Sequence, residues 1–277
     1  MYFFFANGSH QRNPTRDGMG PLVAVGGILV NGDDLGTLEQ GLGVLCADFG
    51  FPENEEFKWS PGRDLWMHDN LVGDDREHFF LRALEHAAGL EVAAVVVVED
   101  LSRAPATRPD LEHEMDATVL LLERVDNLLG QRGDSGVVIV DRQGGGRQDD
   151  DAFLLNCLET LREGTDYTTL QRIPINVLSA PSKFVRCLQL AALITGCTLA
   201  RVGGASTYSP LIFDTAVRHL LHRDGDRVGG VGLKLHPDFV YANLYHWLLE
   251  DPYWWKGNMG VPLPVAGRPY ADDPNPN

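Results

Sequence analysis

Residues 2–30 read YFFFANGSHQRNPTRDGMGPLVAVGGILV, and this stretch decides the fold class. Aromatic residues fill its beginning (2–6) and a nearly continuous apolar run fills its end (21–30), so each predicts a buried strand. The segment between them is rich in Gly, Pro and Asn, which predicts a polar turn from Asn7 onward and then a loop. The sequence therefore begins with two neighbouring strands that no helix separates.

The chain then alternates between helical and strand patterns. The expected helices cover 34–49, 74–89, about 109–129, about 150–161 and 182–200, and the expected strands cover 91–100, 135–142 and 173–178. Asp33 or Asp34 can cap the first helix. Strands that alternate with helices predict an α/β sheet covered on both faces. Because an antiparallel start precedes this alternation, a ribonuclease H-like mixed sheet flanked by helices is favoured over a doubly wound nucleotide-binding fold.

A chain of 277 residues is long enough for one large domain with an appendage. We expect residues 1–200 to form a ribonuclease H-like domain and residues 201–277 to form a C-terminal helical, aromatic extension packed on the same domain. These aromatic residues either pack an added helix onto the core, or anchor a protein partner, a second copy of the chain or a nucleic-acid base. They are Tyr241, Tyr245, Trp247, Tyr253, Trp254 and Trp255.

Composition limits the class of protein. The formal net charge of −16 argues against a surface that attracts nucleic acid everywhere, but it leaves room for a local basic groove. Acidic residues can gather around a divalent metal or simply keep the protein soluble. No stretch approaches the roughly 20 apolar residues of a membrane span, so we expect a cytoplasmic protein without a membrane partner. The four cysteines are widely spaced, which predicts buried free thiols.

Four polar residues are candidates for chemistry. Asp141 follows a buried strand, where a carboxylate is held rigidly, either as a metal ligand or as the cap of a turn. Glu56 and Lys58 are two residues apart, so an extended segment points both to one side, as a metal ligand beside a phosphate-binding ammonium group or as an ordinary ion pair. Gln189 interrupts an apolar helix, and its amide needs a partner, either in the site or in the core.

Several familiar motifs are missing from the sequence. Neither HExxH nor a Cys/His zinc spacing occurs, which makes zinc hydrolysis a poor interpretation. The glycine-rich pieces match neither GxGxxG nor GxxxxGK[ST], and no GxSxG elbow is present. A small-molecule enzyme in an α/β fold stays open as an alternative, without a cofactor that the sequence names.

Taken in order, these segments resemble the domain of unknown function 3800 family, which is placed among ribonuclease H-like folds. The family's first strand ends in Asp-Glu-Ser-Gly, to which Asn7–His10 correspond, and its glycine-containing second strand is matched by Ala24–Gly27. Its Glu-x-Lys element is matched by Glu56–Lys58, and its strand ending in Asp-Arg by Asp141–Arg142. Its Gln-x-Ala-Asp helix is matched by Gln189–Ala192. The resemblance covers roughly residues 1–200.

The resemblance implies a nuclease that hydrolyses DNA or RNA, in defence against phage or mobile elements, with Mg²⁺ or Mn²⁺ held by carboxylates from separate segments. The implied catalytic set is Asn7, Glu56, Lys58, Asp141, Gln189 and Ala192, of which Asn7, Glu56 and Asp141 are the metal ligands. Two family aspartates are replaced here, by Asn7 and Ala192. Because an Asn offers one carbonyl oxygen and an Ala none, we expect a pseudoenzyme that is inactive as it stands. The alternative is a non-catalytic protein that binds nucleic acid or protein on the same fold.

Overall fold

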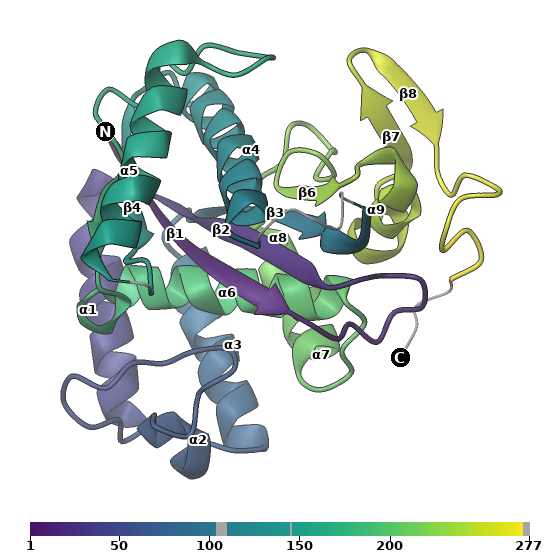
Figure 1. Ribbon diagram of the computed structural model, residues 1–277. Coiled ribbons are helices and arrows are strands. Elements are labelled where there is room, and N and C mark those ends of the chain that lie inside the picture. Colours follow the sequence, from purple (N-terminus) through teal and green to yellow (C-terminus); the bar gives the residue numbers. More distant parts are fainter. Residues whose placement is uncertain (104–109, 145, 274–277) are drawn as a thin grey trace.

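A computed structural model describes residues 1–103, 110–144 and 146–273, and within them a mixed six-stranded sheet forms the centre of the protein (Figure 1). The strands are β1 (Tyr2–Gln11), β2 (Leu22–Asn31), β3 (Ala93–Asp100), β4 (Gly136–Asp141), β5 (Leu178–Ala180) and β6 (Leu233–His236), in the order β5-β4-β1-β2-β3-β6. β1, β2 and β3 pair antiparallel, whereas β4, β5 and β6 each lie parallel to a neighbour. The expected mixed α/β sheet with an antiparallel start is confirmed.

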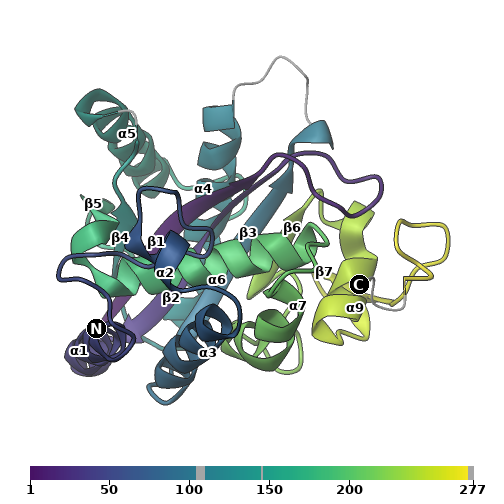
Figure 2. The ribbon, with the colours of Figure 1, turned by 90° about the horizontal axis from the view of Figure 1, so that it is seen from below.

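Helices cover both faces of this sheet (Figure 2). On one face α6 (Arg186–Val202) packs along β1 and β2, with α1 (Gly32–Asp48) and α3 (Asp74–Ala88) beside it. On the other face α4 (Asp110–Gln131) packs against β2 and β3, with α5 (Arg147–Glu163) next to it. Side chains alternate between faces along a strand, so Phe5 lies in the α6-side core and Phe4 in the α4-side core.

Shorter elements connect these layers. They are α2 (Trp66–Asn70), α7 (Ser209–Ile212), α8 (Arg218–Leu220) and α9 (Ala242–Leu249), the 3-10 turns η1 (Leu101–Arg103), η2 (Ser182–Phe184) and η4 (Phe239–Tyr241), and the π-helical turn η3 (Phe213–Val217). The strands β7 (Tyr253–Lys256) and β8 (Met259–Pro262) form a separate hairpin. Among the described residues, no helix combines the length and the apolarity that crossing a membrane requires.

Expectations about where β1 ends and how α1 begins were wrong. β1 does not turn at Asn7 but continues to Gln11, because β2 offers a pairing partner along its whole length. The cap of α1 is Asn31, whose side chain accepts a hydrogen bond from the backbone N–H of Asp33 (3.1 Å), rather than Asp33 or Asp34. The polar residues after position 6 therefore lie in the sheet itself, where strand geometry fixes their direction.

The strand expected at 173–178 is much shorter and lies later, since β5 covers only Leu178–Ala180. Pairing with β4 begins only at Leu178, and Ile173 and Val177 bury their side chains in the α4-side core without joining the sheet. The first residue of the helix expected at about 109–129 lies outside the described residues; the helix itself is α4.

The C-terminal part of the chain is more than a helical extension, because its strand β6 pairs with β3 and forms an edge of the central sheet. Most of its aromatic residues pack inward. Tyr241 and Tyr245 are buried in the α6-side core, and the Trp247 indole N–H donates to the Tyr270 carbonyl (2.8 Å). All four cysteines are buried and unpaired, as expected.

Candidate functional site

Asn7 and Asp141 lie side by side on neighbouring strands. β1 and β4 run parallel with Ala6 opposite Val140, so the next residue of each strand shares a row and points to the same face. Asn7 Nδ2 donates to Asp141 Oδ2 over 3.2 Å. The face is the one that α6 covers, because Phe5, two residues earlier, belongs to that core. Pairing of the strands thus joins two residues 134 positions apart in the sequence.

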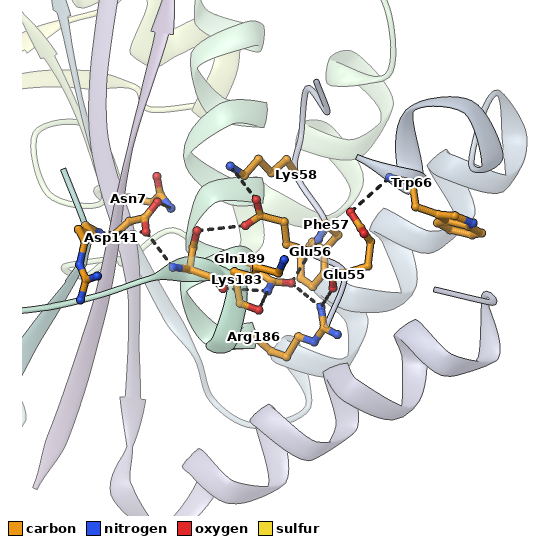
Figure 3. A network of polar contacts seen from close by, with 12 residues as sticks. Asn7, Glu55, Glu56, Phe57, Lys58, Trp66, Asp141, Lys183, Arg186 and Gln189 are labelled. Carbon is orange, nitrogen blue, oxygen red and sulfur yellow. Dashed lines mark hydrogen bonds and ion pairs between the residues drawn. The ribbon is translucent and has the colours of Figure 1, made fainter. Parts of the chain in front are cut away.

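Glu56 reaches this pair from the loop between α1 and α2 (Figure 3). The next residue, Phe57, is fully buried against Phe79 and anchors the loop (ring centroids 5.2 Å apart). Glu56 Oε2 accepts a hydrogen bond from Ser182 Oγ (3.2 Å), and the Ser182 backbone N–H donates to Asp141 Oδ1 (2.9 Å). Ser182, at the start of η2, therefore bridges two carboxylates that come from distant segments.

Lys58 lies on the same side of the loop as Glu56, as the spacing of two predicted. Its ammonium nitrogen is 3.1 Å from Glu56 Oε1, and the Lys58 side chain stays 40% exposed. An ion pair with one partner this accessible contributes about 0–1 kcal/mol to folding. The arrangement places one cation between the site and solvent, where it can meet an anionic ligand.

Gln189 finds partners for its amide within the protein itself, as the core alternative expects. Its side chain is almost fully buried, and its oxygen accepts from the Phe57 N–H (3.3 Å) and from Arg186 Nη1 (2.7 Å). Its amide nitrogen donates to the carbonyls of Ser182 (2.8 Å) and Lys183 (3.3 Å). Gln189 therefore ties the loop that carries Glu56 to the turn that carries Ser182.

Ala192 occupies the same side of α6 as the loop. Gln189 contacts the loop, and a Cβ added to Gly196 would lie 2.8 Å from Trp59 Cβ. Residues three and four apart in a helix are neighbours on its surface, so Ala192 lies between these two contacts, and it is only partly buried. The position suits a ligand from α6, but a methyl group offers no oxygen.

As they stand, these residues fit a divalent ion poorly. Asp141 Oδ1 also accepts the Arg142 N–H (3.0 Å), so each oxygen of Glu56 and Asp141 already accepts a hydrogen bond or faces Lys58. Mg²⁺ requires a near-octahedral set of oxygens. The described part of the chain holds no group of three or more His, Cys, Asp or Glu suited to a metal. The Asn7 amide is the group that compensates Asp141 Oδ2.

Exposed cations and an exposed ring adjoin the site residues in the sequence, and we call Arg142, Lys183 and Phe184 the rim. Arg142 and Lys183 directly follow Asp141 and Ser182 in the sequence, and both are exposed. Phe184 follows Lys183 and is 68% exposed. Cations with an aromatic ring beside them can contact phosphates and a nucleic-acid base.

The comparisons with family models and with curated proteins found no match for the chain that carries this site. The residues that meet here are two carboxylates, one ammonium group and one amide, from the sheet, a loop and a turn.

Proposed function

We propose that this chain is a nuclease-like protein on a ribonuclease H-like fold whose phosphodiesterase site lacks two metal ligands. The observation that carries the proposal is the chain of hydrogen bonds that links Asn7 to Asp141 and, through Ser182, Asp141 to Glu56. The sheet supports the fold assignment, because three antiparallel strands are followed by β4 and β5, each parallel to its neighbour.

Charge explains why we expect no hydrolysis from the chain as it stands. A two-metal site needs several carboxylates to hold two dications about 4 Å apart. Here Glu56 and Asp141 supply two negative charges, and Lys58 offsets one of them. The amide of Asn7 and the methyl of Ala192 add no charge. We therefore expect Mg²⁺ or Mn²⁺ to bind weakly and phosphodiester cleavage to be absent or very slow.

The substrate class follows from the rim. Lys58 contacts Glu56, and the exposed residues Arg142 and Lys183 adjoin Asp141 and Ser182 in the sequence, although the chain carries a net charge of −16. Local cations in an acidic protein favour an anionic ligand at this place, and phosphates of DNA or RNA are the ligands that the proposed chemistry requires.

The second candidate is a protein that binds nucleic acid on the same fold without cleaving it. The hydrogen bonds that Asp141 accepts from Asn7 and Ser182 favour it, since they compensate the carboxylate without an ion. The basic rim serves binding in either case. The two functions differ in the activity expected once the missing carboxylates are restored.

The deciding experiment restores both ligands in the double variant Asn7→Asp/Ala192→Asp. Mn²⁺ binding is measured by calorimetry, and cleavage of labelled single- and double-stranded DNA and RNA is measured with Mg²⁺ or Mn²⁺. We expect the double variant to gain both activities, and a triple variant that adds Asp141→Asn to lose them. No gain of Mn²⁺ binding would refute the metal site, whereas binding without cleavage would leave the non-catalytic candidate.

Binding at the rim is tested separately, with the unmodified chain. Arg142→Ala/Lys183→Ala should weaken binding of a labelled oligonucleotide and reduce its dependence on salt. The control is Arg82→Ala, which removes an exposed cation on α3. Equal affinity for the double variant, the control and the unmodified chain would show that nucleic acid does not contact this rim.

A further inference from the structure

The hairpin of β7 and β8 presents two aromatic rings to solvent. Alternate residues of a strand point to opposite sides, and Trp254 packs inward against Phe239 (ring centroids 4.5 Å apart). Tyr253 and Trp255 therefore face outward and remain 43% and 39% exposed. Their ring centroids lie 5.8 Å apart with the planes at 55°, so the two rings are neighbours tilted toward different directions.

Acidic side chains line the same hollow. It has a volume of about 520 Å³ and lies between the hairpin and the loop 224–227, with Asp224, Asp226 and Asp251 in its lining. Asp224 is paired with Arg227 (3.6 Å), whereas exposed Asp226 forms no ion pair with any residue of the described ranges. Asp251 is buried and accepts hydrogen bonds from backbone N–H groups of the neighbouring loop. Arg227 lines the hollow as well, so three carboxylates and one cation share the lining with the two rings.

We propose that this aromatic and acidic hollow binds an alkylated ammonium group, either of a free molecule such as choline or of a methylated lysine in a peptide. The faces of Trp and Tyr rings attract cations, and this attraction is strongest where the cation is desolvated. Asp226 supplies the opposite charge, and the acidic surface of the whole chain raises the local concentration of cations. The volume lies in the range of small-ligand pockets.

The same features disfavour a nucleic-acid base on these rings. Stacking on an aromatic ring tolerates any base, but the attached phosphates would approach the carboxylates of Asp224 and Asp226. The β7–β8 hairpin also lies beyond β6, on the side of the sheet away from β4 (Figure 1). The proposal therefore does not rest on the proposed function of the Asn7 site.

Calorimetric titration with choline and with its uncharged isostere, 3,3-dimethyl-1-butanol, tests the chemistry. We expect choline to bind at least about 10-fold more tightly than the isostere, because the two share shape and differ in charge. A peptide with trimethyllysine, compared with the same peptide carrying norleucine, distinguishes a peptide ligand from a free one. If neither cation binds, or if the neutral partner binds equally well in both pairs, the proposal is overturned.

Variants locate the binding. Trp255→Ala should weaken binding of the cation by about 5- to 30-fold, and Asp226→Asn by about 3-fold with a flatter salt dependence. Tyr167→Ala, which removes a tyrosine that is 85% exposed elsewhere, should change nothing. Asp226 is a surface residue, so its variant decides the outcome even if Trp255→Ala does not fold. Unchanged affinity in folded Asp226→Asn would overturn the proposal.

Discussion

Replacing Asn7 by Asp should destabilise the protein in a way that depends on pH. The Asn7 amide now donates to Asp141 over 3.2 Å, and the variant places a second negative charge there. Like charges about 4 Å apart repel by about 1 kcal/mol in bulk water and by about 4 kcal/mol at an effective dielectric constant of about 20. Loss of a hydrogen bond to a charged group adds about 1.5–3 kcal/mol. Because both residues are half-buried, we expect the free energy of unfolding to fall by about 2–4 kcal/mol near pH 8.

Urea denaturation followed by tryptophan fluorescence measures this loss between pH 4 and pH 8. The repulsion requires both carboxyl groups to be ionised, and carboxyl groups of unfolded chains titrate near about pH 4. The difference between Asn7→Asp and the unmodified chain should therefore be small at pH 4 and should widen as the pH rises. If the two carboxylates of the Asn7→Asp variant, at positions 7 and 141, hold Mn²⁺, an ion concentration 100-fold above Kd should raise the free energy of unfolding by about 2.7 kcal/mol at pH 8.

A matched control separates this effect from charge alone. Ser9→Asp adds the same charge two residues farther along β1, beyond the end of β4, and should show little of this pH dependence. If Asn7→Asp is as stable as the control at every pH, Asn7 and Asp141 do not lie in contact, and the site is refuted.

Three further perturbations test the packing around the site and the C-terminal part. Gln189→Leu leaves buried backbone groups without partners and should lower the free energy of unfolding in urea by about 2–4 kcal/mol. Burial and a hydrogen bond to Asp100 raise the pKa of Tyr241 to about 12. The protonated Tyr241 side chain therefore stabilises the fold fully below about pH 10, and this stabilisation is lost as the pH rises toward 12. In Tyr241→Phe, urea midpoints should fall less steeply over this pH range than in the unmodified chain. Burial raises the pKa of Cys46 to about 11 and of Cys157 to about 12, so a thiol reagent at pH 8 should label the folded chain slowly and label four thiols after unfolding.

The main sheet could be predicted from the sequence because its strands are long and apolar. The runs 21–30 and 91–100 indicate buried strands without reference to the rest of the chain. β6 could not be predicted in this way. Its four residues, LKLH, become a strand only because β3 offers an open edge, and that edge is visible only in the folded chain. The polar half of β1 is a similar case, since pairing with β2 overrides the turn signal of Asn7 and Gly8.

The site was partly predictable for a related reason. The strand-end position of Asp141 and the spacing of Glu56 and Lys58 are local features, and the structure brings these residues together. Ser182 was missed because half of its contribution is a backbone N–H, which any residue except proline could provide. The position of Gln189 in an apolar helix indicates that its amide has a buried partner. The sequence could not show whether that partner is a ligand or the protein itself.

The interactions that hold the Glu56 loop and the start of α6 in place do not use the side chains at positions 7 and 192. Gln189 fastens the loop to η2, and the Glu39 carboxylate accepts the N–H groups of Arg186 (2.7 Å) and Cys187 (2.9 Å) at the start of α6. A fold with this framework tolerates the loss of metal ligands, because nothing in the framework depends on a bound ion. The hydrogen bonds of this framework therefore form whether or not the site is active. Under the proposed function, the charge at these two positions decides whether a bound phosphodiester is cleaved or only held.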